Sequence, residues 1–375
     1  NFDDFLKIDI TSINLDGPIS EGDDTAFIMY TSGTTSNPKG CPLSHSNMMH
    51  ATIAMMERWT ISGKDVFWDP LPMFHMSSIL PFSACLMAKS EFISTVHFDP
   101  DQSIKVLEES EVSIAFPAFP AVMLALVNHP DFSSSKLSKI RIINNVAPVD
   151  TLRSFQEALP NAKLVSAYGL TEASGVCSYG SPDDPLEKRI TTSGKPFKGV
   201  KIRIIHPETG EEVPADEKGL IEISGPTVFK GYLNDPTKTK ETLSSDGWLS
   251  TGDFGSLSED GFISYHGRLK DMLKVGGENV AALEIESFYN NHEGVMISQV
   301  VGVDDERLGE VPALFIETKE GVTLTAEELI ESAKGKISNF KIPRYVVFVD
   351  DWPMSSTKVQ KFKLKDYDLG EKVFG

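Results

Sequence analysis

The chain has 375 residues, of which 40% are hydrophobic and 24% are charged, and its formal net charge is −19. These values are typical of a globular protein with two or three domains, and no apolar run is long enough to cross a bilayer. So acidic a chain repels nucleic acid and anionic lipid, which excludes proteins that bind polyanions through overall charge.

Cys41, Cys85 and Cys177 are far apart and lack the spacing of metal ligands. They indicate a reducing compartment, so we expect a cytoplasmic protein. The chain begins with Asn1 and shows no signal peptide, and a targeting segment upstream stays an alternative.

The segment Tyr30–Gly40 reads YTSGTTSNPKG and is rich in serine and threonine hydroxyls. The apolar run Ala26–Tyr30 predicts a strand before it, and Ser44–Trp59 predicts a helix after it, with Ser44 as the N-cap. Strand, small-residue loop and helix together are typical of a phosphate site, because backbone N–H groups can surround the anion. The candidate phosphate ligands of this segment are Thr31, Ser32, Gly33, Thr34, Thr35 and Lys39.

The segment differs from the P-loop, because Pro38 stands at the second glycine position and Gly40 follows the lysine. A Ser/Thr-rich surface turn is the alternative interpretation. The whole string resembles the phosphate-binding signature of the acyl-adenylate-forming superfamily, which includes acyl-CoA synthetases, peptide-synthetase adenylation domains and beetle luciferases. In that superfamily a sizeable subdomain precedes the loop, so we expect this chain to lack its amino-terminal portion.

A strand predicted at Val66–Pro72 leads into the apolar string that contains His75. A lone histidine in such a string is usually a core residue. The resemblance implies instead that His75 lies at the end of an acyl pocket.

The next hundred residues alternate between predicted helices and strands, which argues for βα units on a parallel sheet and an α/β fold. The strand ends at Tyr30 and Ser166 would then lie at the carboxyl edge, where open α/β sheets bind ligands. The resemblance places Ala147 and Pro148 beside adenine. The helices are predicted at 101–110, 119–128 and 151–159, and the strands at 112–116, 140–144 and 163–166.

The string YGLTE begins at Tyr168 and is a second signature of the superfamily. Tyr168 offers a flat face to adenine, and Gly169 allows a close approach to the backbone. Thr171 can bond the α-phosphate, and Glu172 can bind magnesium together with Thr31. The alternative is a strand-to-helix turn with a glutamate favoured by the helix dipole.

Short β elements between residues 200 and 268 predict a small barrel-like subdomain. Asp253 follows a glycine and is suited to accept both ribose hydroxyls, with an ordinary Asx turn as the alternative. The resemblance implies that Arg268 contacts the nucleotide. The segment Gly231–Pro236 also matches the superfamily, and we interpret it as structural.

The resemblance places a hinge at Lys270, so we expect a large AMP-binding lobe over residues 1–269 and a mobile α+β lobe over residues 270–375. In relatives that use CoA, a loop matching Lys274, Gly276 and Gly277 lies by the pantetheine channel. Lys358 matches the lysine used for adenylation, although Thr357 replaces the usual glycine before it. A basic surface tail is the alternative, because Lys361 and other lysines follow.

Together these signatures predict an acid–thiol ligase that uses ATP, Mg²⁺ and CoA. It would convert a carboxylic acid, fatty or aryl, to acyl-AMP and then to acyl-CoA. The alternatives are an adenylation domain that loads a carrier protein, a luciferase-like oxygenase, and an inactive nucleotide- or acyl-binding module. The sequence leaves the oligomeric state open, with a homodimer as one alternative. The expected catalytic residues are Lys358, Thr171, Glu172 and His75.

Overall fold

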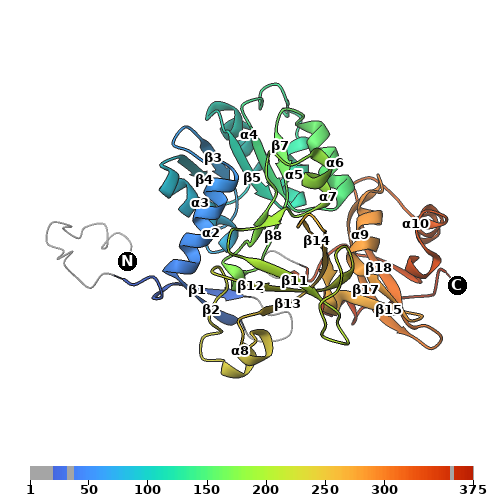
Figure 1. The fold of residues 1–375 in the computed structure, drawn as a ribbon. Helices are drawn as coiled ribbons and strands as arrows, with labels where there is room; N and C mark the ends of the chain where they lie inside the picture. Colours follow the sequence, from blue (N-terminus) through green and yellow to red (C-terminus); the bar gives the residue numbers. More distant parts are fainter. Residues whose placement is uncertain (1–19, 32–37, 355–358, 375) are drawn as a thin grey trace, which may run out of the picture.

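The computed structural model describes residues 20–31, 38–354 and 359–374 of the chain. A large lobe carries a parallel sheet flanked by helices, a hairpin and antiparallel strands, and a smaller carboxyl-terminal lobe lies beside it (Figure 1). Within these residues, none of the helices is both long and apolar enough to span a membrane.

A five-stranded parallel sheet forms the upper part of the large lobe in Figure 1, with the strand order β4–β3–β5–β6–β7. The sheet confirms the α/β prediction. Its strands are β3 (Val66–Asp69), β4 (Glu91–Ser94), β5 (Ile114–Ala118), β6 (Ile142–Asn145) and β7 (Lys163–Val165). The helices of this lobe include α2 (His45–Arg58), α3 (Met76–Ala88), α4 (Pro100–Glu109), α5 (Pro120–Val127), α6 (Val149–Ala158) and α7 (Leu186–Thr191).

Both faces of the parallel sheet are buried. Phe67 and Ile142 belong to one hydrophobic cluster, and their neighbours Trp68 and Ile143 belong to another. Successive side chains of a strand point to opposite faces, so each face of the sheet needs its own covering layer. This explains why these strands appear in the sequence as continuous apolar runs.

The phosphate-loop region differs from the predicted strand, loop and helix. Strand β1 (Thr25–Thr31) pairs antiparallel with β2 (Lys39–Ser44), and the two form a separate hairpin. Tyr30 therefore does not lie at the edge of the parallel sheet, and that prediction was wrong. The short β2 contains Pro42, which lowers strand propensity, and only pairing with β1 makes it a strand.

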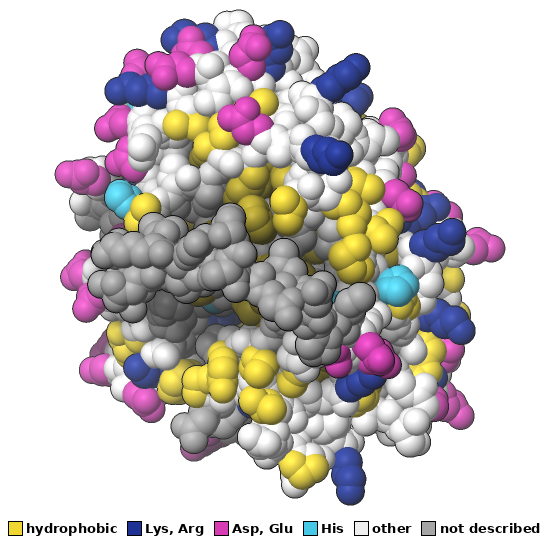
Figure 2. Space-filling view, turned by 90° about the vertical axis from the view of Figure 1, so that its left-hand side faces the viewer, with side chains coloured by type: hydrophobic (Ala, Val, Ile, Leu, Met, Phe, Trp, Pro, Cys, Tyr) yellow, Lys and Arg dark blue, Asp and Glu magenta, His cyan; other side chains and the backbone are white. Residues whose placement is uncertain are grey.

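Helix α2 begins as predicted. Ser44 is its N-cap, and Ser44 and Asn47 form a reciprocal capping box. The helix buries Met48 and Met55 but leaves Met49 and Ile53 exposed. The side of the molecule that carries this helix therefore presents hydrophobic side chains to solvent (Figure 2).

Antiparallel strands complete the large lobe. The expected barrel-like subdomain is an open four-stranded sheet with the order β11–β12–β13–β14. Its strands are β11 (Lys201–Ile205), β12 (Lys218–Ser224), β13 (Leu249–Leu257) and β14 (Ile263–Arg268). The remaining elements are β8 (Ala167–Tyr168), β9 (Ser178–Tyr179), β10 (Lys195–Pro196), the 3₁₀ helix η2 (Thr171–Ala173) and α8 (Pro236–Thr242).

The smaller lobe is α+β, as predicted, with its own hydrophobic clusters. A two-residue turn at Gly276 and Gly277 joins β15 to β16, and both glycines have positive φ, as tight hairpins require. Its strands are β15 (Met272–Val275), β16 (Glu278–Ala281), β17 (Val295–Asp305), β18 (Gly309–Thr318) and β19 (Tyr345–Phe348). Its helices are η3 (Leu269–Asp271), α9 (Ala282–Asn290), α10 (Ala326–Ala333), η4 (Asn339–Lys341) and α11 (Lys361–Leu364).

Candidate active site

The hairpin β1–β2 brings Thr31 and Lys39 directly opposite each other. The Oγ1 atom of Thr31 is buried and has no hydrogen-bond partner among the residues that the structure describes. A buried hydroxyl without a partner is costly, and a bound ion or ligand would satisfy it. The other candidate phosphate ligands, Ser32, Gly33, Thr34 and Thr35, lie outside the described residues.

Tyr232 connects Lys39 to Glu172. The Nζ atom of Lys39 lies 4.8 Å from the centroid of the Tyr232 ring, in a cation–π contact. The hydroxyl of Tyr232 donates a hydrogen bond of 2.8 Å to Oε1 of Glu172. The two superfamily signatures, far apart in the sequence, therefore meet through one aromatic side chain.

Glu172 lies in η2, next to Thr171, and its side chain is buried. The turn before η2 is tightly packed. A Cβ atom added at Gly169 would collide with the backbone of Gly175 and Val176. We expected Gly169 to admit a substrate, and the structure adds an internal reason for a glycine at this position.

Tyr168 and Asp253 form a buried pair, 5% and 6% exposed. The hydroxyl of Tyr168 donates a hydrogen bond of 2.9 Å to Oδ2 of Asp253. Arg268 approaches the other carboxylate oxygen, with Nε 3.5 Å from Oδ1. Burial, and then the charge of Asp253, raises the pKa of Tyr168 well above its ordinary value, so the phenol stays a donor.

The ring of Tyr168 also stacks on Tyr265, with centroids 5.9 Å apart and an interplanar angle of 26°. An adenine base would reach the Tyr168 ring only after the groups that cover it have moved. The expected stacking of adenine on Tyr168 therefore stays a prediction.

The structure brings His75 towards the same region. His75 precedes α3 as its N-cap, and its ring packs against Phe74 with centroids 4.6 Å apart. The following residue, Met76, contacts Gly175, and Gly175 lies two residues after the end of η2. The predicted acyl-pocket residue therefore lies near the segment that carries Glu172.

Ala147 and Pro148 follow β6, and Pro148 is the N-cap of α6. In the sheet, Asn144 of β6 pairs with Val165 of β7. Tyr168 lies three residues beyond Val165, just as Ala147 lies three beyond Asn144. Ala147, Pro148 and Tyr168 therefore follow the same edge of the parallel sheet.

The donor set fits a magnesium ion that the protein holds through few ligands. Among the described residues, no group of three or more His, Cys, Asp and Glu side chains could hold a metal. Mg²⁺ in nucleotide sites is usually bound by one or two protein oxygens and by substrate phosphates. The unpartnered Thr31 hydroxyl and the Glu172 carboxylate are oxygen donors of this kind.

The smaller lobe carries the remaining predicted residues. Lys270 lies in η3, which contacts β13, the strand of Asp253. Lys274 donates its backbone N–H to Oε2 of Glu310, and Gly276 donates its own to Leu308, so the predicted CoA-binding turn is held by its own lobe. Lys358 lies outside the described residues.

Three relationships were not predicted from the sequence. Tyr232 lies in a segment that we interpreted as structural, and Tyr265 lies in a strand without a signature. Lys361, which we considered a surface lysine, forms an ion pair of 2.5 Å with the buried Glu286. For Tyr232, its place in the segment Gly231–Pro236 that matches the superfamily was the one signal in the sequence that could have indicated a functional role.

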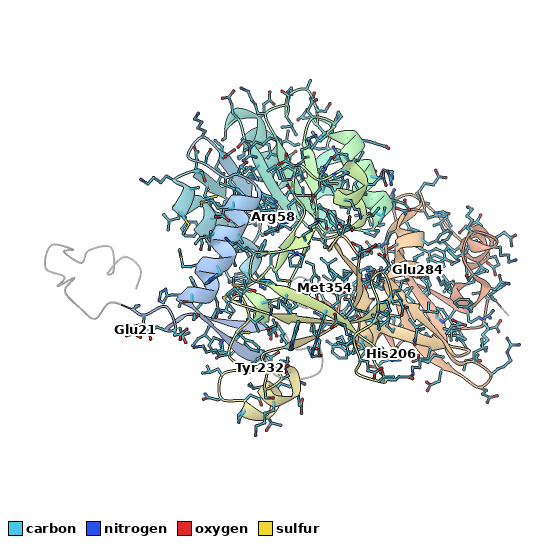
Figure 3. All side chains as sticks on the ribbon, viewed as in Figure 1. Glu21, Arg58, His206, Tyr232, Glu284 and Met354 are labelled. Atoms are coloured by element: carbon cyan, nitrogen blue, oxygen red, sulfur yellow. The ribbon has the colours of Figure 1, made fainter. Side chains whose placement is uncertain are left out.

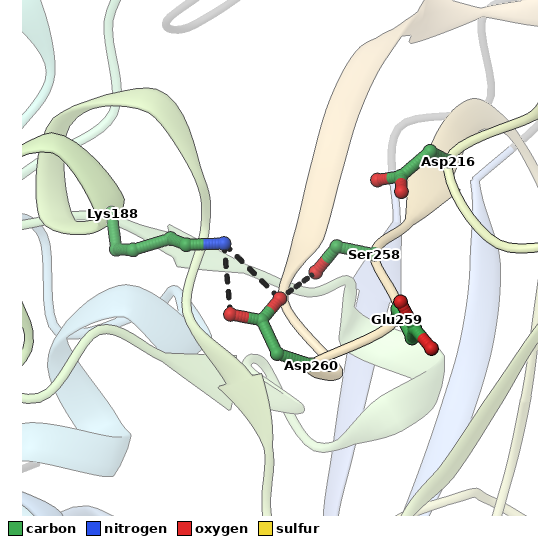
Figure 4. Close-up of a pocket in the computed structure, with 5 residues that line it drawn as sticks. All are labelled: Lys188, Asp216, Ser258, Glu259 and Asp260. Carbon is green, nitrogen blue, oxygen red and sulfur yellow. Dashed lines mark hydrogen bonds and ion pairs between the residues drawn. The ribbon is translucent and has the colours of Figure 1, made fainter.

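A shallow depression of about 410 Å³ lies away from these residues (Figure 4). Lys188 and Asp260 pair with each other there, because Lys188 Nζ lies 2.9 Å from Oδ2 of Asp260, and Ser258 Oγ lies 2.6 Å from Oδ1. It has no predicted site residue in its lining, so we do not place the chemistry there. The lining residues are Lys188, Asp216, Ser258, Glu259 and Asp260.

Comparison with known proteins finds matches to two family models. The model of the AMP-binding enzymes matches residues 6–233. The model of the AMP-binding enzyme C-terminal domain matches residues 284–359.

Individual proteins are similar over nearly the whole chain. Medium-chain acyl-CoA ligase ACSF2, mitochondrial, from Mus musculus is 36% identical over 353 residues, which are 92% of this chain and 57% of that protein. The ATP-bound crystal structure of MatB from Rhodopseudomonas palustris has a TM-score of 0.85 and 32% identity, covering 92% of this chain and 69% of that one. O-succinylbenzoate coenzyme A synthetase (MenE) from Bacillus subtilis, in complex with ATP and magnesium ion, has a TM-score of 0.85 and 27% identity, covering 97% and 74%. The chain thus spans less than two thirds of the length of the mouse relative.

Proposed function

We propose, from the premise that the chain belongs to the family of AMP-binding enzymes, that it joins a carboxylic acid to CoA with consumption of ATP. The acid first reacts with ATP to give acyl-AMP and pyrophosphate. The thiol of CoA then displaces AMP to give the acyl thioester. The activity named for the mouse ligase supports the transfer to CoA, and the structure of MenE in complex with its acyl-adenylate intermediate supports the first step.

One observation carries the proposal. The string from Tyr168 to Glu172 is bonded at one end to Asp253 and at the other to Tyr232, which contacts Lys39. The Asp253 end offers a carboxylate suited to ribose hydroxyls. The Glu172 end offers a metal-binding carboxylate beside a lysine. This order of groups matches the order of ribose and phosphates in a nucleotide.

Adenylation needs no protein nucleophile. The substrate carboxylate attacks the α-phosphorus, the bond to the bridging oxygen breaks, and pyrophosphate leaves with the electron pair. The protein therefore has to hold two anions together and stabilise charge on the phosphoryl oxygens. Lys39, Thr171 and the predicted Lys358 supply positive charge and a hydroxyl donor for this purpose.

Thr31 and Glu172 would hold Mg²⁺, which neutralises charge on the phosphate oxygens when it is bound. Asp253 would accept the ribose hydroxyls, and Arg268, close to Asp253, would contact the nucleotide. These assignments follow from donor chemistry and from the hydrogen-bond and ion-pair partners of each residue.

We assign residues 1–269 to a large lobe and residues 270–375 to a mobile lobe with its hinge at Lys270. The change of hydrophobic core supports this boundary, because Ile263 packs in the core of the large lobe and Leu273 packs in that of the smaller lobe. Rotation about the hinge would exchange the Lys358 segment for the turn at Gly276 and Gly277. Lys274 and this turn would then face CoA in the second step.

The acid is proposed to be fatty or aryl, with His75 at the end of its pocket. The ring of His75 packs against Phe74 and its helix begins with Met76, so the residues on either side of it in sequence are apolar. The three cysteines are free and buried, which supports a reducing location such as the cytoplasm. A homodimer is a further hypothesis, and light scattering would test it by measuring the molecular mass in solution.

The deciding experiment is acid-dependent exchange between pyrophosphate and ATP over a panel of fatty and aryl acids. AMP formation is then measured with and without CoA for each acid that supports exchange. We expect exchange with at least one acid, and AMP release that depends on CoA. Binding of Mg-ATP without exchange for any acid would indicate a nucleotide-binding module. AMP release that requires a carrier protein would indicate that the carrier protein, and not CoA, accepts the acyl group.

A further inference from the structure

The segment from Phe229 to Leu233 joins the two nucleotide signatures through its backbone. Phe229 donates its N–H to the carbonyl of Glu172 at 2.9 Å, and Leu233 donates its N–H to the carbonyl of Gly40 at 2.9 Å. The side chain of Leu233 also packs against Gly40. One short stretch of chain therefore fixes the end of the phosphate segment relative to η2.

Tyr232 repeats this connection with its side chain. Its ring lies under Lys39 Nζ, and its hydroxyl bonds Oε1 of Glu172. The geometry of the ring is tightly determined, because Tyr232 is 8% exposed and meets Phe229 edge-to-face at 4.9 Å. The backbone N–H of Tyr232 donates to Oγ1 of Thr239 in α8 at 2.9 Å, and Figure 3 shows Tyr232 beside this helix.

The hydroxyl of Tyr232 is the donor in its bond to Glu172, because a carboxylate oxygen only accepts. Because its hydrogen bond occupies Oε1, the rotamer of Glu172 is set before any nucleotide binds.

We infer that Tyr232 is a positioning residue that orients Glu172 and Lys39 to receive Mg-ATP. This inference rests on the proposed function, because it takes Glu172 and Lys39 as nucleotide ligands. Groups that orient a metal ligand by hydrogen bonding commonly change metal affinity about 10–100-fold when they are removed. The segment that we interpreted as structural would then set the affinity for the metal–nucleotide complex.

The test replaces Tyr232 by Phe, which removes the hydroxyl and keeps the ring beneath Lys39. ATP binding is measured by calorimetry over a range of Mg²⁺ concentrations. We expect the Mg²⁺ concentration for half-maximal ATP binding to rise about 10–100-fold. Tyr289→Phe is the matched control, because it removes a buried hydroxyl that has no partner among the described residues of the smaller lobe.

A double-mutant cycle separates positioning from a general structural effect. In a Glu172→Gln background, Tyr232→Phe should raise the Mg²⁺ concentration for half-maximal ATP binding little further, because the two residues act as a unit. The inference would be overturned if Tyr232→Phe left the Mg²⁺ concentration for half-maximal ATP binding unchanged. It would also be overturned if Tyr232→Phe raised that concentration by the same factor in the Glu172→Gln background as in the parent.

The measurement also distinguishes this inference from the proposed function. A parent chain that binds Mg-ATP but shows no exchange with any acid would refute the proposed ligase and still test Tyr232 by binding. A parent chain that exchanges pyrophosphate while Tyr232→Phe behaves like Tyr289→Phe would support the ligase and refute the role of Tyr232. A parent chain that binds no Mg-ATP would refute both.

Discussion

The phenol of Tyr168 donates a 2.9 Å hydrogen bond to the carboxylate of Asp253, across 85 residues of sequence. The bond joins the end of β8 to β13 and fixes Asp253 in a buried position. A hydrogen bond to a charged group is worth about 1.5–3 kcal/mol, so its loss has a measurable effect.

Tyr168→Phe should therefore weaken nucleotide binding. We expect the KM for ATP to rise about tenfold or more, with the KM for the acid nearly unchanged, because the buried carboxylate loses its donor. Steady-state kinetics with each substrate varied in turn would check this. A rise confined to the KM for the acid would show that Asp253 does not serve the nucleotide.

Lys358→Ala should block the first half-reaction and leave the second intact. One preorganised donor to a developing charge is typically worth about 10²–10³ in rate. We expect a loss of that size in pyrophosphate exchange, and normal thioester formation from supplied acyl-AMP. Equal losses in both half-reactions would contradict the assignment of Lys358.

Lys270→Pro tests the proposed hinge. Proline restricts φ and removes a backbone donor, so rotation at this position should be hindered. We expect adenylation to survive and the CoA step to slow, as measured by single-turnover release of AMP. A CoA step at the parent rate would place the hinge elsewhere.

The ion pair between Lys361 and Glu286 should hold the final segment on the smaller lobe. Glu286 is buried and also accepts the N–H of Val300 at 2.7 Å, so loss of Lys361 would leave a buried carboxyl group without its cationic partner. We expect Lys361→Met to lower the free energy of unfolding by about 3 kcal/mol and to slow adenylation. Lys361→Arg keeps the charge, so its free energy of unfolding should fall much less. Equal free energies of unfolding for the two variants in urea denaturation would argue against the ion pair.

Asp69 should make stability depend on pH. It is fully buried at the end of β3, and burial raises its pKa to about 8, although the N–H of Leu71 stabilises the charged form. The folded state therefore keeps the Asp69 proton up to about pH 8, whereas the unfolded state releases it near the ordinary aspartate pKa of 3.8. The unfolded state binds fewer protons in this range, so the free energy of unfolding falls as pH rises from about 4 to about 8 and levels off above.

Asp69→Asn removes this dependence because the amide does not ionise. Relative to the parent, the variant should gain at least about 1 kcal/mol of stability between about pH 5 and pH 8, because a tenfold change in an ionisation constant is worth about 1.36 kcal/mol. Urea titrations at several pH values would measure the difference. Parallel curves for the two proteins would show that Asp69 is not held neutral.

Local patterns predicted much of the large lobe. Ser44 caps α2 as expected, because a serine side chain can satisfy the first helical N–H groups within three residues. The strands around Phe67 and Ile142 were visible as apolar runs, because both faces of their sheet are covered. Helix α3 and strand β4 were not predicted, since Pro81 interrupts the helix and β4 is only four residues long.

The sequence by itself determined which chemical groups are present and the order in which they occur, because each signature is a short string whose backbone conformation is local. Only the tertiary structure decided that Lys39 pairs opposite Thr31 and that Tyr232 bonds Glu172. The same holds for Lys361, which meets Glu286 rather than solvent. The Tyr232–Glu172 and Lys361–Glu286 contacts join residues 60 and 75 positions apart, and they form only because burial of the surrounding core outweighs the entropy of closing such long loops.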